Sequence, residues 1–130
     1  MPSLAKPHHN ILVVEDDLAT REALALLLGA EGYGVTTADD GRAALEQLRH
    51  DPHPDLIVLD LMMPVMDGWE FRNEQLADPQ LSDIPVIVCS AAGPLRQHAD
   101  SLHASAYLDK PVDPSVLVAI VQSSFSVERN

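Results

Sequence analysis

Short runs of apolar residues recur along this chain, separated by segments in which apolar and polar residues are mixed. Most of the runs are continuous rather than alternating, which is typical of strands that are covered on both faces. One run, 33–38, alternates and leaves one face more polar. The runs that we expect to form strands are 11–14, 33–38, 56–59, 84–89 and 105–108.

The segments between these runs have the apolar spacing of helices. The first helix is expected over 18–30, stopping at Gly32. The apolar residues at helical spacing in it are Leu18, Ala23, Leu26, Leu27 and Ala30. Further helices are expected after Asp40, over 67–77, around Leu95 to Leu102, and from Pro114 to about Ser124.

Aspartates precede several of these helices, where a side-chain oxygen can accept a bond from a free N–H group. Asp17, Asp40 and Asp67 are expected N-caps. Asp113 is the strongest helix start, because Pro114 follows it at the position that proline favours. These aspartates therefore have a structural explanation that needs no chemistry.

Five strands alternating with helices predict an α/β fold. We expect a doubly wound, flavodoxin-like sheet of five parallel strands in the order 2-1-3-4-5, with helices on both faces. The length of 130 residues suits one domain. We expect this domain over 10–124, preceded by a flexible arm at 1–9 and followed by a short tail at 125–130.

The chain is acidic, with a formal net charge of −12 and a pI of about 4.6. This balance argues against direct binding to nucleic acid or to anionic membrane surfaces. It permits cations and basic protein surfaces as partners, although solubility alone also explains it.

Other features of the composition favour a soluble cytoplasmic protein. Cys89 is the only cysteine, so no internal disulfide is possible, and its apolar neighbours indicate a buried thiol. The sequence has neither a membrane-length apolar segment nor the apolar core of a secretory signal.

Polar residues follow the expected strands at the points where these end. Glu15, Asp16 and Asp17 follow the first strand, and Asp60 follows the third. Ser90 follows the fourth, and Asp109 and Lys110 follow the fifth. In open α/β sheets, ligands bind beyond the carboxyl ends of the strands, so we expect these residues to form one site.

Carboxylates gathered at one point repel one another unless a cation joins them. Mg²⁺ fits such a set of oxygen ligands best, because it binds few carboxylates and then accepts phosphate oxygens. A carboxylate beside Mg²⁺ can act as a nucleophile toward phosphorus. Asp60 is the candidate nucleophile. Ser90 would then hydrogen-bond a phosphoryl oxygen, and Lys110 would pair either with the phosphoryl group or with Asp60 itself.

Four stretches of the sequence carry a family resemblance. They are ILVVEDD (11–17), LIVLDLMMPVMDG (56–68), IPVIVCSA (84–91) and YLDKP (107–111). In this order and spacing the chain resembles the receiver domains of two-component response regulators. The resemblance implies a phosphoprotein of a two-component or phosphorelay system, with a histidine kinase or phosphotransfer protein as its phosphodonor.

The resemblance also implies metal and phosphate chemistry at named residues. Asp60 matches the phosphoacceptor and a metal ligand. Asp16 matches the direct Mg²⁺ ligand, and Glu15 the acid that acts through water. The backbone carbonyl of Met62 matches a further ligand.

The remaining matches concern the bound phosphoryl group and the switch. Ser90 matches the hydroxyl that turns toward the phosphoryl group, and Tyr107 the aromatic residue that moves with it. Lys110 matches the phosphoryl-binding lysine. The bond between Lys110 and Pro111 matches one that is usually cis in the family.

The sequence departs from the family pattern in two places. The segment between Ser90 and Tyr107 is shorter than usual and lacks the usual glycine before the strand. The third helix is unusually polar from Arg72 to Gln75, which leaves Trp69 and Leu76 to anchor it, with Phe71 at the side.

Enzymatic alternatives fit less well. A phosphatase with an aspartyl nucleophile carries a second Asp two residues later, where this chain has Met62. A flavin carrier would need a phosphate cradle in place of the acidic residues 15–17, and no P-loop motif exists. These departures argue against a turnover enzyme, and the family resemblance implies a protein that promotes its own phosphotransfer and dephosphorylation.

The alternative that stays open is a receiver-like module that binds proteins without phosphorylation. We expect no effector domain after the last helix, and thus a stand-alone receiver. That helix carries Val116, Val118, Ile120 and Val121. They form either an exposed face for a downstream partner or homodimer, or a stripe absorbed by packing on the sheet.

Overall fold

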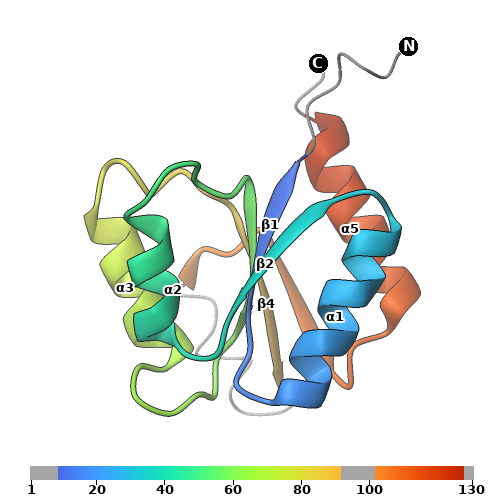
Figure 1. The fold of residues 1–130 in the computed structure, drawn as a ribbon, viewed down its shortest axis with the longest axis horizontal. Helices are drawn as coiled ribbons and strands as arrows, with labels where there is room; N and C mark the ends of the chain where they lie inside the picture. The colour runs from blue at the N-terminus through green and yellow to red at the C-terminus, as the bar shows by residue number, and fades with distance from the viewer. Residues whose placement is uncertain (1–8, 92–101, 128–130) are drawn as a thin grey trace.

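The computed structural model describes residues 9–91 and 102–127, and Figure 1 shows how the elements are arranged. The elements in chain order are β1 (Asn10–Val14), α1 (Leu18–Ala30), β2 (Gly34–Ala38), α2 (Gly41–Leu48), β3 (Leu56–Asp60), α3 (Gly68–Ala77), β4 (Val86–Ala91), β5 (Ala106–Lys110) and α5 (Pro114–Val127). The expected helix around Leu95 to Leu102 falls outside the described residues, apart from Leu102 itself.

All neighbouring strands are parallel, and their order is β2-β1-β3-β4-β5, as predicted. Helices α2 and α3 cover one face of the sheet, and α1 and α5 cover the other (Figure 1). The register places Val14 beside Leu59 and Asp60 beside Cys89. The strand ends that carry the candidate residues therefore meet at one edge of the sheet.

The sheet separates two hydrophobic cores, and this explains the continuous apolar runs. Leu12, Ile57 and Val88 point toward α2 and α3. Their neighbours along each strand, such as Val13 and Val58, join the core under α1 and α5. Because successive side chains of a strand alternate between faces, a strand covered on both sides must be apolar throughout.

The buried face of α1 differs from the expected one. Leu24 and Leu28 are its buried residues, whereas Leu26 is 75% exposed and Leu18, Ala23 and Ala30 are exposed as well. The helix sequence LATREALALLLGA is apolar on nearly every side. Spacing alone therefore does not select the face that packs on the sheet.

The expected anchors of α3 are also wrong in part. The helix buries Phe71, Arg72 and Gln75, while Leu76 is exposed and Trp69 packs only partly against the core. Polar side chains can occupy a core when each of their polar atoms has a hydrogen-bond partner. Arg72 and Gln75 do so through hydrogen bonds to backbone carbonyls and to each other.

The predicted N-caps are confirmed. Asp17 accepts a hydrogen bond from the Thr20 amide, and Asp40 accepts one from the Ala43 amide. Asp67 forms a capping box with Glu70. At the start of α5, the Asp113 carboxylate accepts from the amide and the hydroxyl of Ser115.

Helix α5 continues past the expected end at Ser124 to Val127. Phe125 is buried there, and its ring stacks on that of His9 with centroids 4.0 Å apart. The two ends of the described chain thus meet. None of the helices in the described part of the chain is both long and apolar enough to cross a bilayer.

Candidate functional site

Three acidic side chains meet where β1 and β3 end. Glu15 and Asp60 are buried, at 2% and 4% exposure, and Asp16 is exposed. One carboxylate oxygen from each lies within 4.8 Å of the others. The convergence follows from the fold, because β1 and β3 are adjacent parallel strands.

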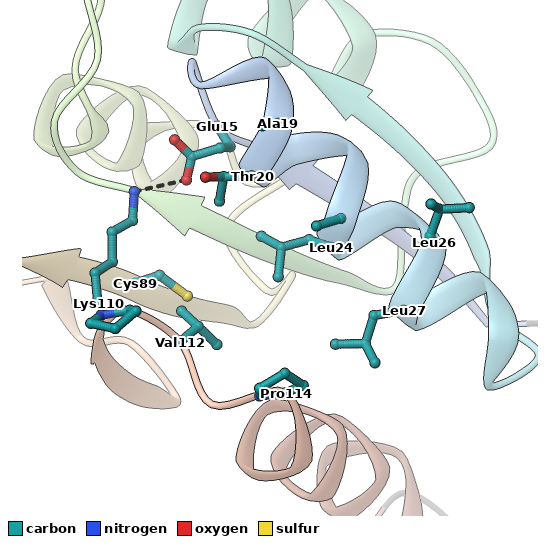
Figure 2. Close-up of a pocket in the computed structure, with 12 residues that line it drawn as sticks. Glu15, Ala19, Thr20, Leu24, Leu26, Leu27, Cys89, Lys110, Val112 and Pro114 are labelled. Atoms are coloured by element: carbon teal, nitrogen blue, oxygen red, sulfur yellow. Dashed lines mark hydrogen bonds and ion pairs between the residues drawn. The ribbon is translucent and has the colours of Figure 1, made fainter.

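Lys110 reaches this acidic group from the end of β5. Its Nζ lies 2.8 Å from Oε1 of Glu15 and 3.2 Å from Oδ1 of Asp60. Figure 2 shows the lysine side chain extended toward Glu15. The peptide bond between Lys110 and Pro111 is cis.

Burial dominates the electrostatics of Asp60. It raises the pKa of Asp60 to about 6, with a further rise from the neighbouring Glu15 carboxylate and a partial offset from Lys110. For Lys110, burial acts to lower the pKa, but the hydrogen bond to Glu15 and the charge of Asp60 outweigh it and the pKa is raised. Glu15 and Asp60 thus share the ammonium group of Lys110, Asp16 adds a third carboxylate beside them, and the site favours a further cation.

The donor set fits Mg²⁺. Carboxylate oxygens of Glu15, Asp16 and Asp60 are the hard ligands that this ion prefers, and the exposed Asp16 leaves room for water ligands. The Met62 amide donates a 3.3 Å bond to Oδ1 of Asp60, so the start of the β3–α3 loop lies beside the same carboxylate.

Gly68 is a residue that the sequence analysis did not single out. Its amide donates a 2.9 Å bond to the Leu61 carbonyl. A Cβ atom on Gly68 would lie 2.7 Å from the carbonyl oxygen of Asp60 and 2.7 Å from Cα of Leu61. Only glycine lets α3 start this close to the acidic site, and its place directly after the capping Asp67 was the available signal.

Arg21 of α1 is a second residue that sequence reasoning missed. Its Nη1 donates to the backbone carbonyls of Glu15, at 2.9 Å, and of Asp16, at 3.4 Å. The Asp17 amide donates to the Glu15 carboxylate at 3.2 Å. These bonds fix the loop after β1, and a lone arginine one turn into a helix gives no sequence signal for that role.

The two switch candidates lie on neighbouring strands. Ser90 pairs with Asp109 in the register of β4 and β5, and its side chain lies outside the described part of the structure. Tyr107 is half-buried and packs against the core under α2 and α3. Its hydroxyl accepts a 3.3 Å bond from the Ala104 amide. The structure thus brings Glu15, Asp16, Asp60 and Lys110 together.

An apolar groove of about 1050 Å³ adjoins the acidic site. Its walls come from α1 and from the connection between β5 and α5, as Figure 2 shows. Glu15 and Lys110 line one end of the groove, and Leu26 and Leu27 line its wall along α1. One wall of the groove is thus formed by apolar residues of α1 that the sheet does not fully cover.

A family model described as the response regulator receiver domain matches residues 11–122. The chain is 38% identical over 129 residues to the alkaline phosphatase synthesis transcriptional regulatory protein SphR of Synechococcus elongatus, covering 92% of this chain and 49% of that protein. It is 36% identical over 115 residues to the phosphate regulon transcriptional regulatory protein PhoB of Escherichia coli, covering 87% of this chain and 50% of that protein. The chain spans about half the length of these relatives.

Solved structures give the same likeness over nearly the whole chain. The chemotaxis protein CheY4 of Vibrio cholerae superposes with a TM-score of 0.81 and 30% identity, covering 90% of this chain and 98% of that one. The phosphorylated cyanobacterial phytochrome response regulator RcpA superposes with a TM-score of 0.76 and 34% identity, covering 90% and 91%.

Proposed function

The chain belongs to the response-regulator receiver domain family, and from this premise we propose that it accepts a phosphoryl group on Asp60, with Mg²⁺ bound beside it. One observation carries the proposal. The oxygens of Glu15, Asp16 and Asp60 lie within 4.8 Å of one another, and the Lys110 ammonium contacts Asp60. The phosphorylated form signals through a change in its surface.

Asp60 supplies the nucleophile. One of its carboxylate oxygens forms a bond to phosphorus while the bond from phosphorus to the donor breaks, and the donor leaves with that electron pair. The reaction needs the ionised carboxylate, and with a pKa of about 6 Asp60 is mostly ionised at neutral pH. Lys110 then pairs with the phosphoryl oxygens.

Asp16, Asp60 and the backbone carbonyl of Met62 would hold Mg²⁺, with Glu15 acting through water. When bound, the ion offsets the repulsion between the carboxylates and the incoming phosphoryl group. The chain's own part is to orient these ligands. Arg21 does so by bonding the Glu15 and Asp16 carbonyls, and Gly68 does so by admitting α3 close to Asp60.

Ser90 and Tyr107 are the proposed switch. The phosphoryl group shifts the balance between two arrangements by its different affinity for each. In one arrangement the Ser90 hydroxyl bonds the phosphoryl group, and Tyr107 leaves its bond to the Ala104 amide. The domain lowers the barriers to its own phosphorylation and dephosphorylation without turning over a substrate as an enzyme does.

We propose a histidine kinase or phosphotransfer protein as the phosphodonor. The apolar groove supports this partner, because Glu15 and Lys110 line one end of it. An apolar helix docked there would lie beside the ammonium group that contacts Asp60.

A downstream protein or a second copy would bind at α5, where Val116 is 42% exposed. Leu117 and Val121 are buried, and Val118 and Ile120 are partly buried, so packing on the sheet absorbs most of the apolar residues of this helix. The relatives named as transcriptional regulators are about twice as long as the matched part. The present chain has a net charge of −12, and we do not expect it to contact nucleic acid itself.

Intact mass spectrometry after incubation with Mg²⁺ and acetyl phosphate tests the proposal. The wild type should gain one phosphoryl group, and Asp60→Asn should gain none. Asp55→Asn, an exposed carboxylate at the opposite end of β3, is the matched control and should react like the wild type. A folded wild type that gains no mass and binds no beryllofluoride would favour a module that works without phosphorylation.

A further inference from the structure

Arg72 is a buried cation in α3. Its side chain is 4% exposed, and its three nitrogens donate to oxygens of uncharged groups. Nε bonds the Leu102 carbonyl at 2.9 Å, and Nη2 bonds the His103 carbonyl at 3.1 Å. Within the described residues, no carboxylate forms an ion pair with it. A desolvated guanidinium without an acid is costly, so its hydrogen bonds must stabilise it.

Gln75 completes this cluster from the next turn of the helix. Its side-chain oxygen accepts a 2.7 Å bond from Nη1 of Arg72. Its Nε2 donates to the carbonyls of Leu81 and Ile84, both at 2.9 Å. The two side chains thus join α3 to the connection before β4 and to the residues before β5.

The first residue of the same helix lies against the phosphoacceptor. Gly68 is in contact with the backbone of Asp60 and Leu61, and Arg72 lies one turn further along α3. A movement of the β3–α3 loop at Asp60 would therefore displace the helix that carries the guanidinium. Packed helices transmit such shifts because close-packed interiors deform little.

The segment that Arg72 binds leads directly to Tyr107. His103 has a φ of 53°, in the left-handed region, and its carbonyl is held by Nη2 of Arg72. The next amide, that of Ala104, donates to the Tyr107 hydroxyl, and the Ser105 amide donates to the Val86 carbonyl. The orientation of the Tyr107 hydroxyl therefore depends on where residues 102–104 are held.

We propose that Arg72 is a positioning residue that couples the phosphorylation state of Asp60, through α3 and residues 102–104, to the conformation of Tyr107. The inference rests on the proposed phosphorylation of Asp60. It identifies the contacts through which a change at Asp60 would alter the conformation of Tyr107. Arg72 itself contacts neither Asp60 nor the phosphoryl group. Its removal should leave phosphorylation intact and uncouple the response of Tyr107.

The test compares two variants of Arg72. Arg72→Met keeps an unbranched side chain and removes all of its N–H donors. Arg72→Lys keeps the positive charge but loses the planar guanidinium group that bonds several acceptors at once. Arg49→Met is the matched control, because Arg49 is the exposed C-cap of α2 and its ion pair within the described residues is with the exposed Glu46. The chain has two tyrosines, so ring ¹³C labelling gives two sets of signals. Tyr33, which packs near Phe125 in the other core, is the internal reference.

One sample of each protein is incubated with Mg²⁺ and beryllofluoride, and its tyrosine ring signals are recorded by NMR. A second sample is incubated with Mg²⁺ and acetyl phosphate, and its phosphorylation is measured by intact mass. All variants should be phosphorylated like the wild type. In the wild type and in Arg49→Met, the Tyr107 signals should shift on beryllofluoride binding while those of Tyr33 stay in place. In Arg72→Met, the Tyr107 shift should fall at least about two-fold, as expected for a residue within a coupling network. Arg72→Lys should give an intermediate shift.

The outcomes separate the two proposals. A wild type that gains no phosphoryl group overturns the proposed function. If the wild type is phosphorylated but Arg72→Met shows the same Tyr107 shift, the coupling role of Arg72 alone is overturned. The same holds if the Tyr107 signals of the phosphorylated wild type do not shift on beryllofluoride binding. If circular dichroism shows that Arg72→Met is unfolded, Arg72→Lys decides, and a full Tyr107 shift in that variant overturns the role.

Discussion

At the scale of single residues, the properties of Asp60 come from its neighbours. The side chain is almost fully buried beside the Glu15 carboxylate, and one ammonium group serves both acids. The fold therefore maintains a charge arrangement that is unfavourable without a cation. A charge arrangement that lowers the stability of the folded protein is typical of a functional site.

Replacing Asp60 by asparagine should stabilise the protein at neutral pH without Mg²⁺. The pKa of Asp60 is raised from 3.8 to about 6 in the folded state, so folding binds this proton more tightly. The stability that the proton provides is fully present below a pH of about 4 and is lost as the pH rises through about 6. Asp60→Asn avoids that loss, and we expect a gain on the order of 2 kcal/mol near neutral pH.

Urea unfolding of wild type and Asp60→Asn across this pH range measures the effect. The difference between them should shrink toward zero as the pH falls to about 4, because the wild-type carboxyl is then protonated in both states. Asp83→Asn, at an exposed carboxylate, controls for the loss of one charge. A difference that is constant across the range would contradict the burial of an ionised Asp60.

At the scale of helices and strands, the sequence predicts more about where elements begin than about which way they face. Local chemistry sets the starts, since Asp17, Asp40 and Asp67 each bond an amide three residues later. The face of α1 could not be predicted because its apolar residues surround the helix. The burial of Arg72 could not be predicted either, because its acceptors at Leu102 and His103 are distant in sequence.

The observed face of α1 gives a direct test. Leu26→Gln should change the free energy of unfolding by no more than about 0.5 kcal/mol, because its side chain lies in solvent at the groove. Leu28→Ala should cost about 2–5 kcal/mol, because it opens a cavity in the core under α1. A larger loss in Leu26→Gln than in Leu28→Ala, measured by chemical denaturation, would show that α1 packs on the sheet through the face that the sequence predicts.

The contact of α3 with the acidic site gives a second test. Gly68→Ala should cost about 1–3 kcal/mol, because its Cβ would meet backbone atoms of Asp60 and Leu61 that cannot move aside freely. It should also slow phosphorylation by acetyl phosphate by displacing the carboxylate. Gly29→Ala is the control. Apart from its chain neighbours and the backbone of its own helix, no described atom lies within 4 Å of its Cβ position, and alanine favours the helix by up to about 1 kcal/mol. Denaturation and intact-mass time courses measure both effects.

At the scale of the whole molecule, the sheet converts distant sequence positions into one site. Strand order and the convergence of Glu15, Asp16, Asp60 and Lys110 could be predicted. Continuous apolar runs define parallel strands, five alternating strand–helix units fit the order 2-1-3-4-5, and the carboxyl ends of such strands meet at one edge. The supporting contacts of Arg21 and Gly68 could not, because they depend on close approach of backbone atoms. Family membership is thus readable from sequence, while the support of the site needs coordinates.

Mg²⁺ binding should stabilise the whole domain against unfolding. At a free concentration of a hundred times Kd, the gain is about 2.7 kcal/mol if only the folded state binds. Thermal unfolding with and without Mg²⁺ measures it, and Asp16→Asn should lose the gain with little change in the metal-free protein, because Asp16 is exposed. Asp51→Asn, an exposed acid that follows α2, should keep it. An undiminished gain in Asp16→Asn would place the ion elsewhere.

The position of Cys89 has a practical consequence. It is the only cysteine in the sequence, it is buried in β4, and burial raises the pKa of its thiol to about 12. Cys89 lines the groove but is only 2% exposed, and a thiol that is buried and protonated should react slowly with maleimides. The native chain should therefore add little background signal in thiol labelling. A cysteine introduced at the exposed Leu26 or Val116 could carry a fluorophore or spin label without any change to the core.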